Sequence, residues 1–177
     1  AYQTLVEADS PLEPAARERL AAALAERSGW LVDAFAQQGY RVALTPGDYY
    51  WGSNGVALGR AVQLLAAHRM TGRAPYREAA LDQLHYVFGR NALGKSFVTG
   101  LGADPVRHPT HQPSIAHPRR LVLPGLLVGG PNAQAEGVAA SAPARAYKDD
   151  GKLYGVNEPT IYWNAALAHV LAHFIAR

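Results

Sequence analysis

The sequence predicts an all-α domain in which helical hairpins carry long irregular loops. Two observations favour this class: apolar residues recur at helical spacing in four stretches, and no alternation of short strands with helices indicates a parallel sheet. The 177 residues suffice for one domain with a core, and a composition of 49% hydrophobic and 18% charged residues is typical of globular proteins. We therefore expect residues 1–177 to belong to a single folded domain.

The sequence predicts four helices. The first covers residues 11 to about 38, the second begins after residue 54 and ends near 71, the third covers residues 76–88, and the fourth covers residues 157 to about 175. Each has apolar residues three or four positions apart, such as Leu20 and Leu24 in the first and Trp163 and Leu167 in the last. A kink or division of the first helix is one interpretation of Ser28-Gly29. The short turn at residues 71–75 predicts an antiparallel pair formed by the second and third helices.

Residues 89–156 are rich in glycine and proline and show no sustained periodicity. A loop region this long inside a compact domain is usually functional. Two apolar triplets on either side of Pro124-Gly125 predict short buried extended pieces, Leu121-Val122-Leu123 and Leu126-Leu127-Val128.

Composition limits the partners that the chain can have. A formal net charge of +3, without a basic stripe interleaved with aromatic residues, does not predict nucleic-acid binding. No apolar run is long enough to span a bilayer. The absence of cysteine excludes disulfides and thiolate metal sites, and we expect neither a metal nor a cofactor. The N-terminal residues Ala1-Tyr2-Gln3-Thr4 lack a signal-peptide pattern and an initiator Met, as a mature or cleaved end would.

One match to a nucleotide-binding pattern is set aside by its context. Residues 89–96 read Gly-Arg-Asn-Ala-Leu-Gly-Lys-Ser, which fits the phosphate-binding pattern G-x-x-x-x-G-K-S. Such a loop works between a buried strand and a helix, whereas this one follows a predicted helix and precedes a stretch that cannot be a regular helix.

His169 and His173 share a helix face, but no glutamate between them completes a zinc-protease motif, so surface or core positions are expected.

The stretch at residues 147–165 is the strongest candidate for a functional site. Asp149 and Glu158 lie among aromatic residues just before the last predicted helix, and sugar-cleaving sites combine carboxyl groups with aromatic rings. The alternative is a helix cap after a solvated loop, with Asn157 as N-cap and Glu158-Pro159 in the first turn. In that position the helix dipole would lower the pKa of Glu158, while Asp149 or burial would raise it. The sequence does not decide which of these influences on the pKa of Glu158 is larger.

These residues resemble the C-terminal part of glycoside hydrolase family 9, the inverting cellulase family with an (α/α)6 barrel. The acidic motif of that family spaces an aromatic residue, two acidic residues and an asparagine along the chain, and every position is satisfied here, by Tyr147, Asp149, Tyr154, Glu158, Thr160, Asn164 and Ala165. The resemblance extends over Trp51-Gly52-Ser53-Asn54 and over residues 88–102 and 124–131. It implies the C-terminal portion of an (α/α)6 barrel with long irregular loops.

The resemblance also implies roles for individual residues. Glu158 would be the general acid, and Asp149 would help to hold substrate and set the electrostatics of the acid. Contacts with the sugar are expected from Trp51, Tyr154 and Asn157, although Trp51 and the neighbouring Tyr49 and Tyr50 fit a core role equally well.

A second family motif is altered in this chain. Where the family ends that motif with Pro-His-His-Arg, the chain has Pro109-Thr110-His111-Gln112. Gln112 cannot make the bidentate charged contact of an arginine, and Thr110 is too short to replace an imidazole. We expect Thr110, His111 and Gln112 to contact substrate differently, which implies a different substrate or reduced activity.

The resemblance implies a β-glucan or oligosaccharide substrate, no cofactor and a secreted or periplasmic location. An inverting glycosidase also needs a second carboxylate as base. The family takes it from an Asp-Ala-Gly-Asp-like motif upstream, and no such motif occurs here. We therefore expect an upstream segment or second polypeptide to complete the barrel and supply the base. The alternative is a catalytically impaired, carbohydrate-binding remnant of the family.

Overall fold

A computed structural model describes residues 11–119 and 121–175 of the chain. Four long helices are present, α2 (Pro14–Ala36), α3 (Ser53–Thr71), α4 (Ala74–Val87) and α7 (Ile161–Ile175). Four short helical turns lie between them, η1 (Pro46–Asp48), α5 (Gln112–Ala116), η2 (Pro143–Arg145) and α6 (Tyr154–Asn157). Within the described residues the extended structure is limited to two isolated bridges. The prediction of an all-α fold is confirmed.

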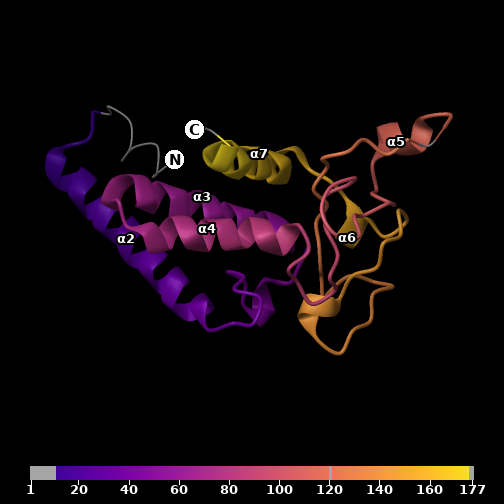
Figure 1. Ribbon diagram of the computed structural model, residues 1–177, viewed down its shortest axis with the longest axis horizontal. Helices are drawn as coiled ribbons and strands as arrows, with labels where there is room; N and C mark the ends of the chain where they lie inside the picture. The colour runs from indigo at the N-terminus through magenta and orange to yellow at the C-terminus, as the bar shows by residue number, and fades with distance from the viewer. Residues whose placement is uncertain (1–10, 120, 176–177) are drawn as a thin grey trace.

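The long helices form one body, and the loops gather at one end of it (Figure 1). The central pair is α3 and α4, which run antiparallel as expected and are joined by a turn at Gly72. Gly72 has a positive φ of 70°, a conformation that glycine adopts without the penalty of a side chain. Helix α7 packs on one side of this pair, and α2 contacts both helices on the other side.

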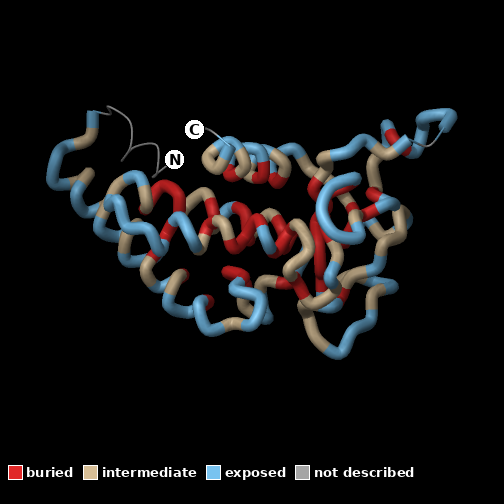
Figure 2. The backbone as a smooth tube through the Cα atoms, in the orientation of Figure 1, coloured by how far each residue is buried: buried red, intermediate tan, exposed pale blue. Residues whose placement is uncertain are grey.

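The core lies between the helices and continues into the loop end (Figure 2). Leu58, Ala61 and Leu65 of α3 are fully buried at helical spacing. Val170 contributes the facing surface of α7, and Phe97 carries the core into the loop region. The loops that hold the candidate site are thus anchored on the same core as the helices.

The prediction of one helix starting at Asn157 is wrong. Asn157 ends the single turn α6, Glu158 has extended backbone with φ −73° and ψ 126°, and α7 starts only at Ile161. The physical reason is Pro159, because proline disfavours helical backbone in the residue before it. Glu158 is therefore not in the first turn of a helix, and the helix-dipole argument for its pKa does not apply.

Three other expectations have clear outcomes. Helix α2 is continuous through Ser28-Gly29, and the hydroxyl of the buried Ser28 donates to the carbonyl of Leu24 at 2.7 Å. Leu127 and Val128 are buried in bridges as predicted, but Leu121 and Leu123 are 54% and 53% exposed.

No helix directly follows residues 89–96, so this stretch lacks the context of a phosphate-binding loop. Residues 1–4, read above as a cleaved end, lie outside the described residues.

Two glycines at the start of α3 make room for the indole of Trp163. A Cβ atom built on Gly52 or Gly55 would overlap the ring, which is 5% exposed. Gly59 lies one turn further along α3 and has no atom within 4 Å of the position of a Cβ. The same substitution should therefore have opposite effects at Gly55 and Gly59.

We expect Gly55→Ala to destabilise the chain by about 1–3 kcal/mol, because the ring must shift out of a packed position. Gly59→Ala should stabilise it by about 0.5–1 kcal/mol, since alanine loses less backbone entropy in a helix. Urea unfolding followed by circular dichroism measures both. Similar midpoints for the two variants would contradict the packing of Trp163 against Gly55.

Asp48 joins the turn η1 to helix α3. Arg60 donates to both carboxylate oxygens of Asp48 at 2.9 Å, and the amide and hydroxyl of Thr45 donate to it at 2.6 and 2.7 Å. Burial by itself would raise the pKa of Asp48, but these hydrogen bonds and the charge of Arg60 outweigh it and hold the pKa below its usual value.

A group whose pKa is lowered by folding stabilises the fold when it is ionised. The stabilisation by Asp48 should be complete above its unfolded pKa of about 3.9 and lost as the pH falls through the lowered folded pKa. Asp48→Asn should thus lower the stability at neutral pH, and the difference from the wild type should shrink in acid. Unfolding midpoints measured from pH 7 down to pH 3 test this. A difference that is constant with pH would contradict it.

Candidate active site

The backbone of Glu158 is held by a strip of chain, residues 126–131. Within this strip the amide of Gly129 donates to the carbonyl of Glu158 at 3.0 Å, and that of Gly130 donates to Val156 at 3.0 Å. A bridge pairs Val128 with Pro159. Glu158 is therefore fixed on both sides by main-chain contacts, although it lies in no long helix and no sheet.

The N-terminus of α3 holds the other edge of the 126–131 strip. The amide of Asn54 donates to Gly129 at 3.0 Å, its side-chain nitrogen donates to Val128 at 2.9 Å, and Ser53 donates to Pro131 at 2.7 Å. Gly130 has a positive φ of 86°, and a Cβ there would overlap the Asn54 amide. Two separate glycine-containing segments of the sequence therefore combine to position Glu158.

Asn164 of α7 fastens the strip from a third direction. Its side-chain oxygen accepts from the amide of Leu127 at 2.8 Å, and its nitrogen donates to the carbonyl of the same residue at 3.1 Å. One asparagine side chain thus pairs with Leu127 as a neighbouring strand would. This contact gives a structural reason for the asparagine that stands six residues after Glu158 in the acidic motif.

The side chain of Glu158 borders an open cleft of about 520 Å³. Two aromatic residues line the same cleft, Trp51 at 44% exposure and Tyr154 at 67% exposure. The Trp51 ring packs edge to face on Trp163, with 5.0 Å between ring centroids, and this contact holds the ring although Trp51 stays exposed. The structure thus brings Glu158, Trp51 and Tyr154 to one cleft, and their roles toward a sugar stay a prediction.

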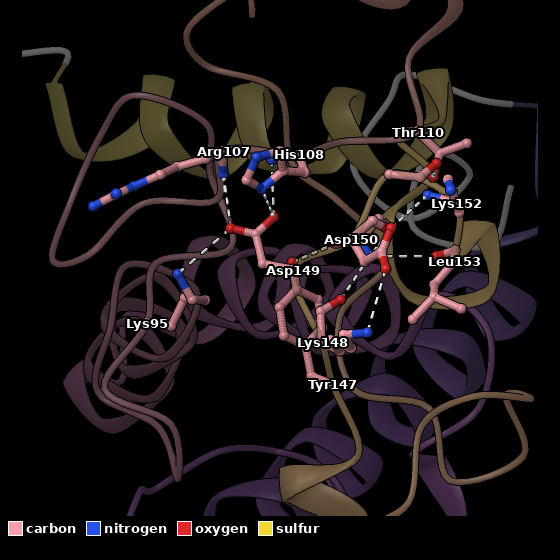
Figure 3. A network of polar contacts seen from close by, with 12 residues as sticks. Lys95, Arg107, His108, Thr110, Tyr147, Lys148, Asp149, Asp150, Lys152 and Leu153 are labelled. Carbon is pink, nitrogen blue, oxygen red and sulfur yellow. Dashed lines mark hydrogen bonds and ion pairs between the residues drawn. The ribbon is translucent and has the colours of Figure 1, made fainter.

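Asp149 holds a loop in place (Figure 3). Its carboxylate accepts from the amides of Arg107 and His108 at 3.0 and 2.9 Å, and the ammonium of Lys95 lies 3.7 Å away. The loop that it binds leads directly into Thr110. Asp149 does not line the Glu158 cleft, so its contacts in this structure position the loop at residues 107–110.

Asn157 is fully buried and makes only internal contacts. Its amide nitrogen lies within hydrogen-bond distance of three carbonyls, those of Lys148 at 2.8 Å, Asp150 at 2.9 Å and Leu153 at 3.3 Å. Its oxygen accepts from the hydroxyl of Tyr147 at 2.6 Å. The structure therefore places Asn157 behind the cleft wall, where it shapes the loop before Glu158, and not among residues that can reach a sugar.

Burial raises the pKa of Tyr147 above its usual range, and the nearby charge of Asp149 adds to this rise. The phenol therefore stays protonated at all physiological pH values. It remains a donor to Asn157, and the two side chains lock residues 147–157 into one loop.

The altered motif at residues 109–112 also has definite partners. The Thr110 hydroxyl donates to the carbonyl of Gly151 at 2.9 Å, and its amide donates to Asn157 at 2.9 Å. A ring nitrogen of His111 lies 2.8 Å from the hydroxyl of Ser114. Gln112 is exposed at the start of α5. Thr110 thus joins two loops, while Gln112 is free of such a role.

The chain matches the model of glycosyl hydrolase family 9 over residues 3–171. It belongs to that family. Endoglucanase C of Cellulomonas fimi is 37% identical to it over 150 residues, which are 76% of this chain and 14% of the relative. Cellulose 1,4-beta-cellobiosidase of Acetivibrio thermocellus is 34% identical over 161 residues, 81% of this chain and 18% of the relative.

Solved structures of family 9 enzymes superpose on nearly the whole chain. A metagenome-derived endoglucanase of the family is 40% identical, with a TM-score of 0.90 over 98% of this chain and 32% of its own. AaCel9A in complex with cellobiose-like isofagomine is 31% identical, with a TM-score of 0.86 over 99% of this chain and 35% of its own. The chain thus has the fold of the C-terminal portion of an (α/α)6 barrel, as predicted, and spans about a third of these structures.

Sequence reasoning missed four polar residues that line this cleft together with Glu158: Asn132, Gln134, Glu136 and Lys152. Lys152 also borders a second hollow of about 360 Å³, which Arg107 and Ser114 line as well. Lys152 lies within the 147–165 stretch, between Asp149 and Glu158, so its position in the sequence was a usable signal. Glu136 lies in a loop without a motif, and only its place in the cleft marks it.

Side chains that could bind a metal are dispersed in the part of the chain that the structure describes. No group of three or more metal-ligating side chains occurs among residues 11–119 and 121–175. His173 of α7 contacts His68 edge to face, and burial together with the charges of Arg77 and Arg69 lowers the pKa of His173.

Among residues 11–119 and 121–175, no helix is both long and apolar enough to cross a membrane.

Proposed function

We propose that this chain is the acid-bearing part of an inverting glycoside hydrolase. It would cleave β-1,4-glucosidic bonds in cellulose-type glucans or their oligosaccharides. The observation that carries the proposal is the cleft in which the Glu158 carboxyl group lies beside the exposed rings of Trp51 and Tyr154. The names of the relatives, an endoglucanase and a cellobiosidase among them, support this substrate class.

Glu158 is the general acid in this proposal. Protonation of the leaving oxygen requires a carboxyl group that substrate can reach and whose backbone does not move, because the proton must be delivered to one oxygen atom. The 126–131 strip supplies that rigidity through the carbonyl of Glu158 and the bridge to Pro159. Trp51 and Tyr154 would orient the sugar rings through their exposed faces.

Asp149 acts in this proposal by positioning. Its carboxylate carries the loop that contains Thr110, His111 and Gln112, and the side chain of Gln112 is available to substrate. We assign substrate contact to His111 and Gln112 and loop positioning to Asp149, Thr110 and Asn157.

The catalytic base is assigned to a segment outside these 177 residues, on the same polypeptide or a second one. An inverting mechanism needs a carboxylate roughly 6.5–9.5 Å from the acid, across the sugar ring. Glu136 is the other carboxylate of the cleft, but it is exposed, and no hydrogen bond from the described residues fixes its side chain. A base must hold an attacking water in one place, which favours a carboxylate that is fixed by the rest of the barrel.

The enzyme is placed outside the cytoplasm, secreted or periplasmic, because a cellulose-type polymer is too large to cross a membrane.

A second candidate for the function is a catalytically impaired, carbohydrate-binding remnant of the family. It is favoured by Gln112, which stands where the family has an arginine that can make a bidentate charged contact.

Nuclear magnetic resonance of cellooligosaccharide hydrolysis distinguishes these candidates when the chain is combined with the rest of its barrel. The proposal predicts that the α-anomer of the product appears first, because one displacement inverts the anomeric carbon. A β-anomer would refute the inverting mechanism. Binding without hydrolysis would support the remnant.

A further inference from the structure

Two openings of the protein surface share the side chain of Lys152. The larger opening is the cleft that holds Glu158 and Tyr154, and Lys152 lines it. The smaller opening is the hollow of about 360 Å³, which Arg107 and Ser114 line together with Lys152. We call this smaller opening the side hollow. A sugar chain that lies in the cleft can therefore place a branch in the side hollow, next to Lys152.

The side hollow has an apolar lining with polar groups beside it. Pro109, Ile115 and Val122 supply the apolar part, and the hydroxyl of Ser114 supplies a polar group. Its volume is at the lower end of the range of small-molecule sites, which is about 300–1,000 Å³. Such a lining suits one sugar ring, because the ring has apolar C–H groups on its faces and hydroxyl groups at its edge.

Lys152 brings a positive charge that has no close partner. Its side chain is exposed, and among the described residues no ion pair joins its ammonium group to a carboxylate. Asp150 also lines the side hollow, but one of its oxygens lies 3.3 Å from the ammonium of Lys148 and the other accepts from the amide of Lys152 at 3.1 Å. The Lys152 ammonium is therefore available to an anionic ligand.

The altered motif at residues 109–112 holds the backbone next to Lys152. The hydroxyl of Thr110 donates to the carbonyl of Gly151 at 2.9 Å, and Figure 3 shows Thr110 beside Lys152. Thr110 stands where the family motif has a histidine, and Gln112 stands where it has an arginine. The chain thus lacks the cation of Gln112's position and presents another one at Lys152.

Arg107 adds positive charge to the side hollow from a different direction. Its guanidinium is 71% exposed and lies 3.6 Å from the carboxylate of Asp104, and an exposed ion pair of this kind is weak. Figure 3 shows the side chain of Arg107 pointing away from Lys152, so the two cations do not converge on one atom. Arg107 would attract an anion to the side hollow, and Lys152 would bind it.

We propose that the side hollow binds a uronic acid, carried as a branch on the β-1,4-linked sugar chain in the cleft, and that Lys152 selects this branch through an ion pair with its carboxylate. The inference rests on the proposed function, because the branch reaches the side hollow from a sugar chain beside Glu158. Lys152 is then a residue that determines specificity toward acidic, branched substrates.

Other ligand classes match the side hollow less well. A neutral branch would cover part of the Lys152 ammonium and remove water from it without supplying an anion, which is unfavourable. Nucleic acids require several cations along a groove, because each phosphate carries a charge. The side hollow offers one available ammonium near the cleft, which corresponds to a single carboxylate on a sugar.

Calorimetric titration tests the selection without hydrolysis. The protein is the chain combined with the rest of its barrel, and it carries Glu158→Gln so that the sugars stay intact. The probes are two cellooligosaccharides of equal length, one with a single glucuronic acid branch and one with a glucose branch at the same position. We expect the acidic probe to bind about three- to tenfold more tightly at low salt. The ratio should fall as sodium chloride is added, because salt screens an exposed ion pair.

Charge variants in the same background assign the selection to Lys152. Lys152→Gln should bring the ratio of the two affinities to about one, and Lys152→Glu should reverse it. Arg107→Gln should lower the ratio only in part. Arg19→Gln is the matched control, because it removes the same charge from an exposed position on α2, and it should keep the ratio of the parent protein.

Three results would overturn the proposal, and they differ in what else they affect. If both probes bind the parent protein equally well, the proposed function stands and the selection by the side hollow is wrong. If the acidic probe binds more tightly but Lys152→Gln keeps the full ratio, Lys152 is not the selecting residue. If neither probe binds, the proposed function and this inference are both wrong.

Discussion

Replacing Glu158 by glutamine is expected to lower kcat on cellooligosaccharides by about 10²–10⁴-fold, with little change in KM. Glutamine has nearly the shape of the protonated acid but cannot release a proton to the leaving oxygen. The cleft around Trp51 and Tyr154 should be unchanged, so the sugar should still bind. Steady-state kinetics with the complete barrel, and calorimetric titration with an oligosaccharide, give the two quantities.

The choice of substrate shows whether the loss is that of an acid. An aryl glycoside with a strongly acidic leaving group needs no protonation, so Glu158→Gln should reduce its cleavage far less than that of cellooligosaccharides. Equal losses on both substrates would instead mean that Glu158 is structural. Glu26→Gln, an exposed change on α2, is the matched control and should leave both rates unaltered. If Glu136→Gln shows the substrate-dependent loss and Glu158→Gln does not, the acid is Glu136.

Asn157→Ala is expected to have the largest effect on stability, a loss of about 2–5 kcal/mol. The substitution empties a fully buried position, leaves the hydroxyl of Tyr147 without its acceptor, and removes one of the donors to the carbonyls of Lys148 and Asp150. Buried polar groups without partners are costly because they have given up water. Urea unfolding of the variant and the wild type measures the loss.

Two further variants show that the effect comes from the Asn157 network. Tyr147→Phe removes one hydrogen bond of it and should cost about 1 kcal/mol. Gln37→Ala deletes an exposed amide at the end of α2 and should stay within about 0.5 kcal/mol of the wild type. A similar small loss for Asn157→Ala would contradict the assigned network. A wild-type unfolding midpoint with low activity would instead return Asn157 to the list of substrate contacts.

The helices were predictable because each is set by local spacing. Leu58 and Leu65 mark one buried face of α3 in the sequence and in the structure alike. The motif around Glu158 was predictable by its resemblance to a family. The break between α6 and α7 was missed, although Pro159 signals it, because the apolar run after it dominated the interpretation.

The roles of the polar residues could not be predicted, because they depend on contacts between distant loops. Asp149 binds main-chain amides 41 and 42 residues away, and Asn157 is turned inward by carbonyls that no pattern identifies. Glu136 and Lys152 reach the cleft only through folding of the loops. Spacing along the chain reports which residues share a helix face, but it does not report which loops meet.

The contacts that fasten the 126–131 strip have a consequence for how this chain acquires its structure. They join residues that are far apart, with a separation of 74 between Asn54 and Val128 and of 37 between Leu127 and Asn164. Contacts of such separation form slowly, because a long loop must be closed before they stabilise anything, whereas helices gain from neighbours at once. We therefore expect α3 and α7 to form before the strip, so that Glu158 reaches its working position among the last steps of folding.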